Sequence, residues 1–374
     1  MCKALRFCVC TAALLVVVTP AVAAHPLGLS PQPVTLQSAG PMAFGPQSVL
    51  FVGDPVGAVV YAIDAKEATG ISSKPTQDWT TTTLNDLRST IANAVGDGTD
   101  ALKVQVIDIA VDPEMGFVFA SAMVSDAAML FQVIDGDHAK AISMDKVMAS
   151  KIALPDPPAN AITGEGRRAS NKRMESITDL AYAEGRVLVS GLKGQDAASS
   201  ILAFDFPFRD ESVGTDLEIY HAAHGRVEET AAVRTFVPIM INGSPNLLAG
   251  FTCTPLVQFS LADLQSGAKV RGKTVAELGN WNKPLDMVAY EKEGHPYLLV
   301  ANSARGLMKV DLENVASQAA LTERVPDGGT KGLAFEKIES LEGVVQLARI
   351  DDEYCLIVRE LPSKELTLSA VAFP

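Results

Sequence analysis

The sequence predicts an all-β fold, a β-propeller of six blades, from one three-stranded unit that recurs along the chain and from the residues that build it. Each unit has an apolar strand, a turn, a second strand ending in small residues, a variable loop and a third strand that often ends in Asp. Val, Ile, Leu, Phe and Tyr dominate the strands, and Gly, Asp, Asn or Pro mark the turns. The main rival, a pair of β-sandwiches, should not repeat one such unit six times.

The six copies span residues 41–64, 106–134, 177–206, 235–261, 284–312 and 344–373. Propeller blades have a fourth, outer strand, for which "LEIYHA" (217–222) and "LAFEKI" (333–338) are candidates in the third and fifth units. The stretches 65–103 and 136–172 leave room for a seventh, degenerate blade, so that alternative stays open.

Two segments between the units have a different character. The stretch "TLNDLRSTIANAVGDG" (83–98) has apolar residues at helical spacing and a Gly stop, which predicts one short helix inserted between the first and second units. Residues 154–173 are rich in Pro, Gly and charge, which predicts an exposed loop.

The N-terminus has the pattern of a secretory signal peptide. A short basic start precedes the apolar run "TAALLVVVTP" and the small-residue end "AVAA", and the run is too short to span a bilayer. We therefore expect a signal peptide over residues 1–24, cleaved after Ala23 or Ala24, and a single propeller domain over 25–374. Cleavage would direct the mature protein to the periplasm or the medium.

The charge and the cysteine content of the chain limit the kinds of molecule that it is expected to bind. The chain has 44 acidic and 31 basic residues, for a net charge of −13, which opposes binding to nucleic acid or to an anionic membrane surface. Only Cys253 and Cys355 follow the signal segment, and they lie in units that are not neighbours in sequence, so we expect two free thiols rather than a disulfide. We expect Cys355 in the core and Cys253 near a mouth of the central channel, and no segment inserted in a membrane.

One face of the propeller collects the polar loops. In a propeller, the connection from an outer strand to the next inner strand lies on the same face as the loop between the second and third strands. The stretches "RRASNKRMES", "YHAAHGRVEETAAVR" and "GNWNKP" are connections of the first kind, and "TCTP" and "ANSARG" are loops of the second kind. Since loops on a rigid scaffold carry much of binding and catalysis, we expect a site at this mouth, whereas the turns of the opposite face read as ordinary turn chemistry.

Imidazole, carboxylate and thiolate groups at this mouth suit a metal site. His221 and His224, with Glu228 and Cys253, could offer ligands to copper or zinc. If "LEIYHA" is a strand, His224 must reach the metal from the turn that follows it. The alternative places one histidine at the sheet edge and the other in solvent.

A second group of side chains at the same mouth suits an anion. Guanidinium groups bind carboxylate or phosphate through paired hydrogen bonds. The alternative is that each arginine pairs with a neighbouring glutamate, in which case no anion site remains. The candidate ligand-binding residues are Arg173, Glu175, Arg226, Arg234, Asn282, Lys283, Asn302 and Arg305.

Several established motifs are absent from the sequence. It has no Gly-x-Ser-x-Gly elbow, no Walker loop, no Gly-x-Gly-x-x-Gly, no Cys-x-x-Cys-His and no EF-hand loop. The sequence therefore identifies no catalytic residue and leaves open whether the protein is an enzyme.

Phrases such as "MAFGPQSVLFVGD", "ESITDLAY", "YHAAHGR" and "FTCTPLVQF" resemble those of a group of uncharacterised secreted bacterial β-propeller proteins. The similarity runs over most of the chain after the signal segment. It implies a propeller fold and export, and it brings no activity and no functional residues.

The sequence is compatible with two functions. The first is a periplasmic or secreted propeller that binds a small anionic ligand or a partner protein at the mouth of the channel. The second is a copper- or zinc-dependent enzyme or electron-transfer protein with its metal at the same mouth.

Overall fold

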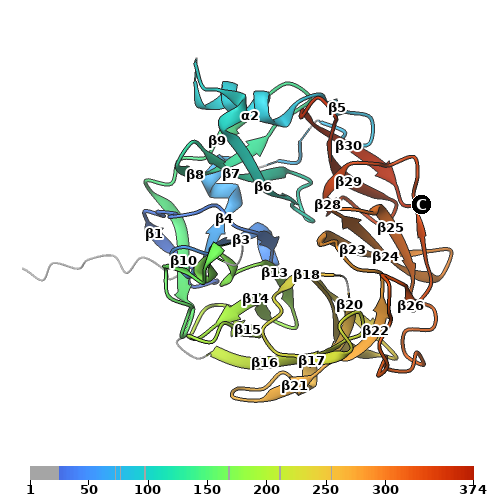
Figure 1. The fold of residues 1–374 in the computed structure, drawn as a ribbon. Coiled ribbons are helices and arrows are strands. Elements are labelled where there is room, and N and C mark those ends of the chain that lie inside the picture. Colours follow the sequence, from blue (N-terminus) through green and yellow to red (C-terminus); the bar gives the residue numbers. More distant parts are fainter. Residues whose placement is uncertain are drawn as a thin grey trace, which may run out of the picture.

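Six antiparallel sheets surround a central axis in a ring (Figure 1), which confirms the predicted six-bladed propeller. The structure is a computed structural model, and it describes residues 25–374 except 72, 76, 97, 167–168, 210–211 and 254. The expected signal peptide lies outside the described residues. We number the blades by the order of their inner strands along the chain.

Each blade contains one of the six repeated units. Blade 1 consists of β2 (Met42–Phe44), β3 (Val49–Asp54), β4 (Val59–Asp64) and β10 (Val147–Ala153), with β1 (Ser30–Gln32) outside β10. Blade 2 consists of β6 (Val104–Val111), β7 (Val118–Val124), β8 (Ala127–Val133) and β9 (Ala139–Ala141). Blade 3 consists of β13 (Asp179–Ala183), β14 (Arg186–Lys193), β15 (Ala198–Asp205) and β16 (Ser212–His221), with β17 (Arg226–Glu228) and β21 (Lys269–Arg271) paired to β16.

The remaining three blades follow the same plan. Blade 4 consists of β18 (Val233–Ile241), β19 (Ser244–Phe251), β20 (Pro255–Ser260) and β22 (Lys273–Glu277), with β26 (Lys331–Gly332) at its edge. Blade 5 consists of β23 (Pro284–Lys292), β24 (His295–Asn302), β25 (Gly306–Asp311) and β27 (Phe335–Lys337). Blade 6 consists of β28 (Val344–Arg349), β29 (Tyr354–Glu360), β30 (Leu366–Ala372) and β5 (Thr83–Leu84).

The order of the blades around the ring differs from their order in the sequence. The inner strands contact one another in the closed series β2, β6, β28, β23, β18, β13 and back to β2. Blade 2 therefore lies between blades 1 and 6, and blade 3 lies on the other side of blade 1. The chain reaches this arrangement by inserting blade 2 between β4 and β10, the third and fourth strands of blade 1.

Six hydrophobic clusters hold neighbouring blades together, one for each interface around the ring. Because each sheet is covered on both faces, its central strands are apolar on both sides; all six residues of β3 are buried, for example. Blades 2 and 6 share the cluster that includes Leu84 of β5, Phe131 and Leu368. The strand β5 thus closes blade 6 with a segment from the N-terminal part of the chain.

The predicted helix is α2 (Leu87–Val95), and the sequence explains both of its ends. The Asp86 carboxylate accepts hydrogen bonds from the backbone N–H groups of Arg88 and Ser89, and Gly96 follows the last helical residue. A second helix, α1 (Ala65–Thr69), continues from β4. Short 3₁₀ segments within the described residues include η1 (Pro46–Ser48), η2 (Ala101–Lys103), η4 (Lys172–Glu175) and η5 (Leu261–Asp263).

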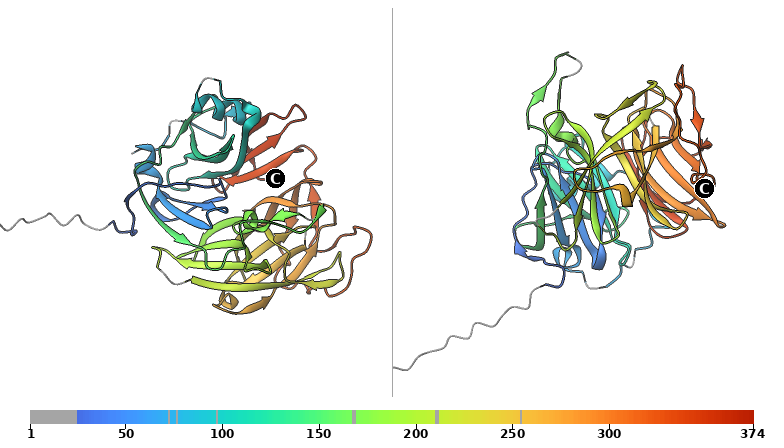
Figure 2. Two further views of the ribbon diagram at one scale, coloured as in Figure 1. Left: turned by 60° about the vertical axis from the view of Figure 1, so that its left-hand side comes forward. Right: turned by 90° about the horizontal axis from the view of Figure 1, so that it is seen from below.

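Neither stretch that left room for a seventh blade holds one in the described residues. Residues 65–103 form α1, β5, α2 and η2, and residues 136–172 include β9 and β10. Within the expected exposed loop, β11 (Ile162–Thr163) and β12 (Ser170–Asn171) pair as a hairpin that projects from one face of the ring (green, Figure 2, right).

In the described part of the chain, no helix has both the length and the apolarity needed to cross a membrane.

Candidate metal centre

The predicted histidine cluster lies on a hairpin at the outer edge of blade 3. His221 is the last residue of β16 and is paired with Arg226 of β17. The turn between them is closed by hydrogen bonds from the N–H groups of His224 and Gly225 to the His221 carbonyl, of 3.1 and 2.8 Å. Gly225 has φ +67°, a left-handed conformation that glycine adopts without cost. His224 therefore projects from the turn, as the strand alternation predicted.

Glu228 joins the two imidazole rings. One oxygen lies 2.7 Å from His221 Nδ1, and the other lies 2.8 Å from His224 Nδ1 and 3.0 Å from Arg226 Nε. Burial alone would raise the pKa of Glu228, but the hydrogen bonds from His221, His224 and Arg226 outweigh it and lower the pKa to about 2. The ionised carboxylate is an acceptor only, so both Nδ1 atoms donate to it, and in the neutral ring Nε2 is the nitrogen with a lone pair.

The environment of His221 is unusual for an imidazole. Its side chain is 2 % exposed, and Nε2 has no hydrogen-bond partner among the described residues. Leaving a buried polar atom unpaired costs about 1–3 kcal/mol. The rings of His221 and His224 lie 3.8 Å apart between centroids, and His224 is 43 % exposed. One histidine is thus fixed inside the protein, and the other faces solvent.

Cys253 approaches the histidines from blade 4. It lies in the turn between β19 and β20, where its N–H donates to the Asn282 carbonyl at 2.8 Å. Its φ of +64° is uncommon for a residue with a side chain, and such conformations persist where the surrounding structure holds them. Its thiol is free and partly exposed, whereas Cys355 is a fully buried core residue, so both predictions about the two thiols are confirmed.

These groups form the one potential metal-ligand cluster found among the described residues. One nitrogen from each imidazole and the Cys253 sulfur all lie within 4.8 Å of one another. Bonds of about 2.0–2.3 Å from zinc to nitrogen and sulfur place neighbouring ligands roughly 3.3–3.8 Å apart. Small side-chain rotations would therefore bring the three atoms to one ion. Because Glu228 takes both Nδ1 atoms, the nitrogens that remain for a metal are the Nε2 atoms.

A buried carboxylate supports the turn that carries the histidines. Glu277, at the end of β22, is fully buried, and one of its oxygens accepts the Ala223 N–H at 2.9 Å. The other oxygen has no hydrogen-bond partner among the described residues. Burial raises the pKa of Glu277 to about 7, although the hydrogen bond from Ala223 acts to lower it. Nothing in "TVAEL" separates Glu277 from an ordinary strand end, so its role could not be predicted from the sequence.

The arginines proposed as anion ligands mostly have partners within the protein. Arg234 binds Glu175 at 2.7 Å and Thr252 at 2.9 Å, and Arg226 binds Glu228. Arg173 donates to the backbone carbonyls of Pro158 and Val56 at 2.6 and 3.3 Å, and Arg305 donates to the Asn280 carbonyl at 3.3 Å. Each of these four guanidinium groups therefore already has a partner within the protein.

The two predicted asparagines organise the loops of the mouth. Asn282 is buried and donates to the carbonyls of Gly279 and Asn280, and its oxygen accepts from the Asn302 side chain at 2.9 Å. Asn302 in turn accepts the N–H groups at residues 304 and 305. Since the Asn282 carbonyl also receives the Cys253 N–H, this pair fixes the loop beside the candidate metal ligands. The Lys283 N–H binds Ser303 Oγ in the same region.

Comparison with known proteins assigns no activity to this chain. No protein-family model matches the sequence, and no curated protein matches it either. Among solved structures, the chain is similar to a PQQ-bound aldose sugar dehydrogenase from Streptomyces coelicolor, with 11 % identity, a TM-score of 0.33, and coverage of 92 % of this chain and 98 % of that one.

Two further structural neighbours are as distant. The extracellular region of plexin A4 gives 9 % identity and a TM-score of 0.40 over 91 % of this chain and 47 % of that one. A hypothetical protein from Leishmania major gives 9 % identity and a TM-score of 0.36 over 74 % and 88 %. At these identities and TM-scores, nothing about ligand or reaction transfers to this chain.

Proposed function

We propose that this protein is an exported β-propeller that binds one copper or zinc ion between the outer edge of blade 3 and the β19–β20 turn of blade 4, through His221, His224 and Cys253. The observation that supports this most strongly is the position of Glu228. Its carboxylate binds both Nδ1 atoms and so leaves the Nε2 atoms for a metal, and one nitrogen of each ring lies within 4.8 Å of the other and of the Cys253 sulfur. A carboxylate behind a ligating histidine is the usual support of a metal site, because it fixes the tautomer and orients the ring.

The donor set suits copper and zinc. Thiolate and imidazole together select these ions over magnesium or calcium, which prefer oxygen ligands. Three protein ligands leave a coordination position for water or substrate, which is the pattern of catalytic rather than structural zinc sites. The partial exposure of His224 and Cys253 gives that position access to solvent. We therefore propose a metal-dependent enzyme or electron-transfer protein rather than a purely structural metal site.

Binding of an anionic ligand or a partner protein through the arginines is the weaker proposal. Arg234 and Arg226 are each neutralised by a glutamate, and Arg173 and Arg305 are bound to backbone carbonyls. A ligand would have to displace these partners. The same mouth exposes Trp281, which is 89 % exposed and could contact a molecule bound beside the metal ligands.

Elemental analysis of the protein purified without a histidine tag tests the proposal. We expect about one copper or zinc ion per chain, and none in the His221→Ala/His224→Ala variant. The matched control is His138→Ala/His295→Ala, which removes two exposed histidines that bind Asp135 and Glu313 and should keep the metal. Absence of metal from the wild-type protein after reconstitution, or its retention in the first variant, would overturn the proposal.

A further inference from the structure

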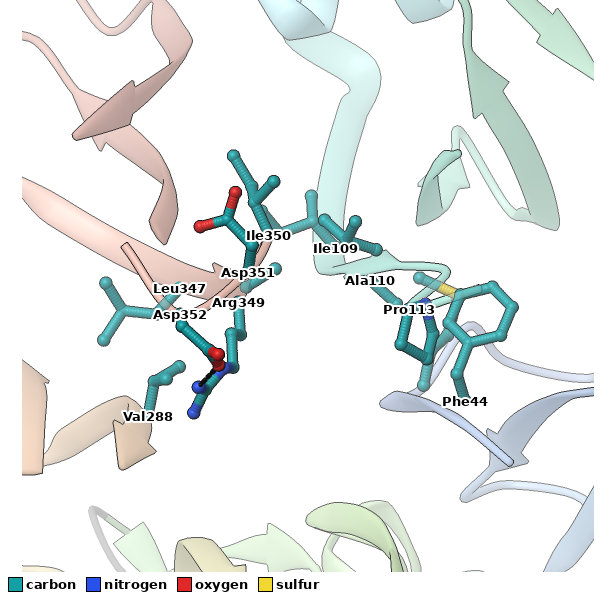
Figure 3. Close-up of a pocket in the computed structure, with 13 residues that line it drawn as sticks. Phe44, Ile109, Ala110, Pro113, Val288, Leu347, Arg349, Ile350, Asp351 and Asp352 are labelled. Carbon is teal, nitrogen blue, oxygen red and sulfur yellow. Dashed lines mark hydrogen bonds and ion pairs between the residues drawn. The ribbon is translucent and has the colours of Figure 1, made fainter. Parts of the chain in front are cut away.

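A large cavity lies on the face of the ring opposite to the histidine cluster. It has a volume of about 520 Å³ and is lined by the inner strands and following turns of blades 1, 2, 5 and 6 (Figure 3). Phe44, Ile109, Val288 and Leu347 supply much of its apolar wall. No site was predicted on this face, because its turns have ordinary turn residues. We call this cavity the funnel.

A narrower cavity continues from the funnel along the axis. It has a volume of about 70 Å³, and every blade contributes to its wall; the lining residues include Asp108, Asp179 and Asp286. We call it the channel. The two cavities share a boundary, since the N–H groups of Met42 and Leu347, which line the funnel, donate to the carboxylates of Asp108 and Asp286 at 2.7 and 2.6 Å.

The three aspartates occupy matching places in alternate blades of the ring. Each accepts the N–H of the next residue in its own strand and one N–H from a neighbouring blade: Asp108 from Met42, Asp179 from Phe236 and Asp286 from Leu347. These bonds tie blade 2 to 1, blade 3 to 4 and blade 5 to 6. Each carboxylate oxygen can accept a further bond from a molecule in the channel.

No basic side chain among the described residues forms an ion pair with these carboxylates. Arg234 lines the channel, but its guanidinium binds Glu175. Thr235 also lines the channel and is 2 % exposed. Its hydroxyl lies beside Asp179 and lowers the pKa of that carboxyl. The channel thus contains three carboxyl groups without a basic partner among the described residues.

Burial raises the pKa of Asp108, Asp179 and Asp286, and the Asp108 charge raises that of Asp286 further. A cation in the channel would oppose this effect and favour ionised carboxylates. Since Asp108 and Asp286 come from blades that also line the funnel, they are the two within reach of a molecule bound there.

We propose that the funnel and the channel together bind a small organic cation, an amidine or amine on an apolar body. The charged group would lie between Asp108 and Asp286, and the body would pack against Phe44, Ile109 and Leu347. An amidinium can bridge two carboxylates through several N–H donors. A single bare metal ion fits less well, because the three aspartates do not form a cluster with all ligand atoms within 4.8 Å in the described chain.

Isothermal titration calorimetry with benzamidine tests this site, and benzamide is the matched uncharged probe. We expect benzamidine to bind at least about tenfold more tightly than benzamide at pH 7. Asp286→Asn should weaken benzamidine binding about tenfold or more, as should Asp108→Asn. The control variant Asp352→Asn removes a carboxylate that lines the funnel but is 96 % exposed and bound to Arg349, and it should change the affinity less than about threefold.

Proton release gives a second readout that a general loss of packing would not produce. Binding at pH 7 should release protons from Asp108 and Asp286, measured as a dependence of the binding heat on the ionisation enthalpy of the buffer. Other charged groups at the two cavities are Asp179, the Arg234–Glu175 pair, Asp351 and the Arg349–Asp352 pair. The number of protons released on binding by the Asp179→Asn variant, compared with the wild type, shows how many of them come from Asp179.

Three results would overturn the proposal. They are equal affinities for benzamidine and benzamide, no binding at millimolar benzamidine, and full binding by a folded Asp286→Asn/Asp108→Asn variant. Displacement of benzamidine by stoichiometric calcium would also overturn it, in favour of a metal ion in the channel. Circular dichroism of each variant separates loss of the site from loss of the fold.

Discussion

Glu228 is the residue on which the candidate metal centre depends most. The sequence placed His221, His224, Glu228 and Cys253 at one mouth because loop positions in a propeller follow from strand order. It could not show that Glu228 binds both rings, since that depends on the register of β16 and β17. It also missed the three aspartates of the channel, whose only signal is an Asp before an apolar pair in "VIDIA", "ITDLA" and "PLDMV".

Removing Glu228 should weaken metal binding without removing a ligand. In Glu228→Ala, both rings lose the acceptor that fixes their Nδ1 protons, and we expect the affinity for zinc or copper to fall about 10- to 100-fold. The neighbouring Glu229→Ala, which loses an exposed ion pair with Lys269 and has no contact with the two imidazoles among those found, serves as the control and should bind as the wild type does. Competition with a chelating dye measures both; equal affinities of the two variants would contradict a supporting role for Glu228.

The channel aspartates should make stability fall as pH rises. Burial raises the pKa of Asp179 from 3.8 to about 6, so between these values the folded protein holds a proton that the unfolded chain has lost. The stabilisation is complete below pH 3.8 and is lost as the pH rises through 6. Relative to Asp179→Asn, the wild-type free energy of unfolding should fall by up to about 3 kcal/mol from pH 3.5 to 7. Urea unfolding at several pH values measures it, and a constant difference would contradict the shift.

Outer strands were the elements that sequence reasoning found least completely. The repeat located the three inner strands of every blade, and it found the fourth strand of blades 3 and 5, now β16 and β27. It missed that β10 completes blade 1 and β5 completes blade 6, because an edge strand of two to seven residues joins its sheet mainly through backbone hydrogen bonds. Such pairing requires no particular pattern of side chains, so it is hard to predict from the sequence.

The closing strand β5 offers a matched test of this topology. Leu84 is fully buried in the cluster between blades 2 and 6, whereas Leu102 is 82 % exposed. Leu84→Ala should lower the free energy of unfolding by about 2–5 kcal/mol through lost burial and a cavity. Leu102→Ala should change it by less than about 0.5 kcal/mol. Chemical unfolding of both variants measures the difference, and equal effects would mean that β5 does not seal blade 6.

The ring as a whole shows what a repeat can and cannot predict. Six similar units predicted six blades. Because the faces of all the blades are apolar, the sequence of a unit does not specify which blades lie beside it. The order 1, 3, 4, 5, 6, 2 around the axis follows from the insertion of blade 2 into blade 1. Blades 3 and 4, which bring His221, His224 and Cys253 together, remain consecutive in this order.

A double-mutant cycle tests whether blade 1 lies against blade 3. A Cβ atom added at Gly53 would lie 2.8 Å from Cγ2 of Ile177, so Gly53→Ala should destabilise the protein by this clash. Ile177→Ala removes the clashing atom, and the two changes should therefore couple by about 0.5–3 kcal/mol, with the double variant less destabilised than the sum. Additive effects on the free energy of unfolding would contradict contact between these blades.

Spectroscopy of the copper(II)-loaded protein tests the central claim most directly, because it reports the ligand atoms rather than the metal content. We predict a thiolate-to-copper charge-transfer band that is lost in Cys253→Ser, together with nitrogen hyperfine coupling from two imidazoles that is reduced in His221→Ala and in His224→Ala. A copper spectrum without thiolate character, or one unchanged by these three substitutions, would show that any bound metal lies elsewhere and would contradict the proposed centre.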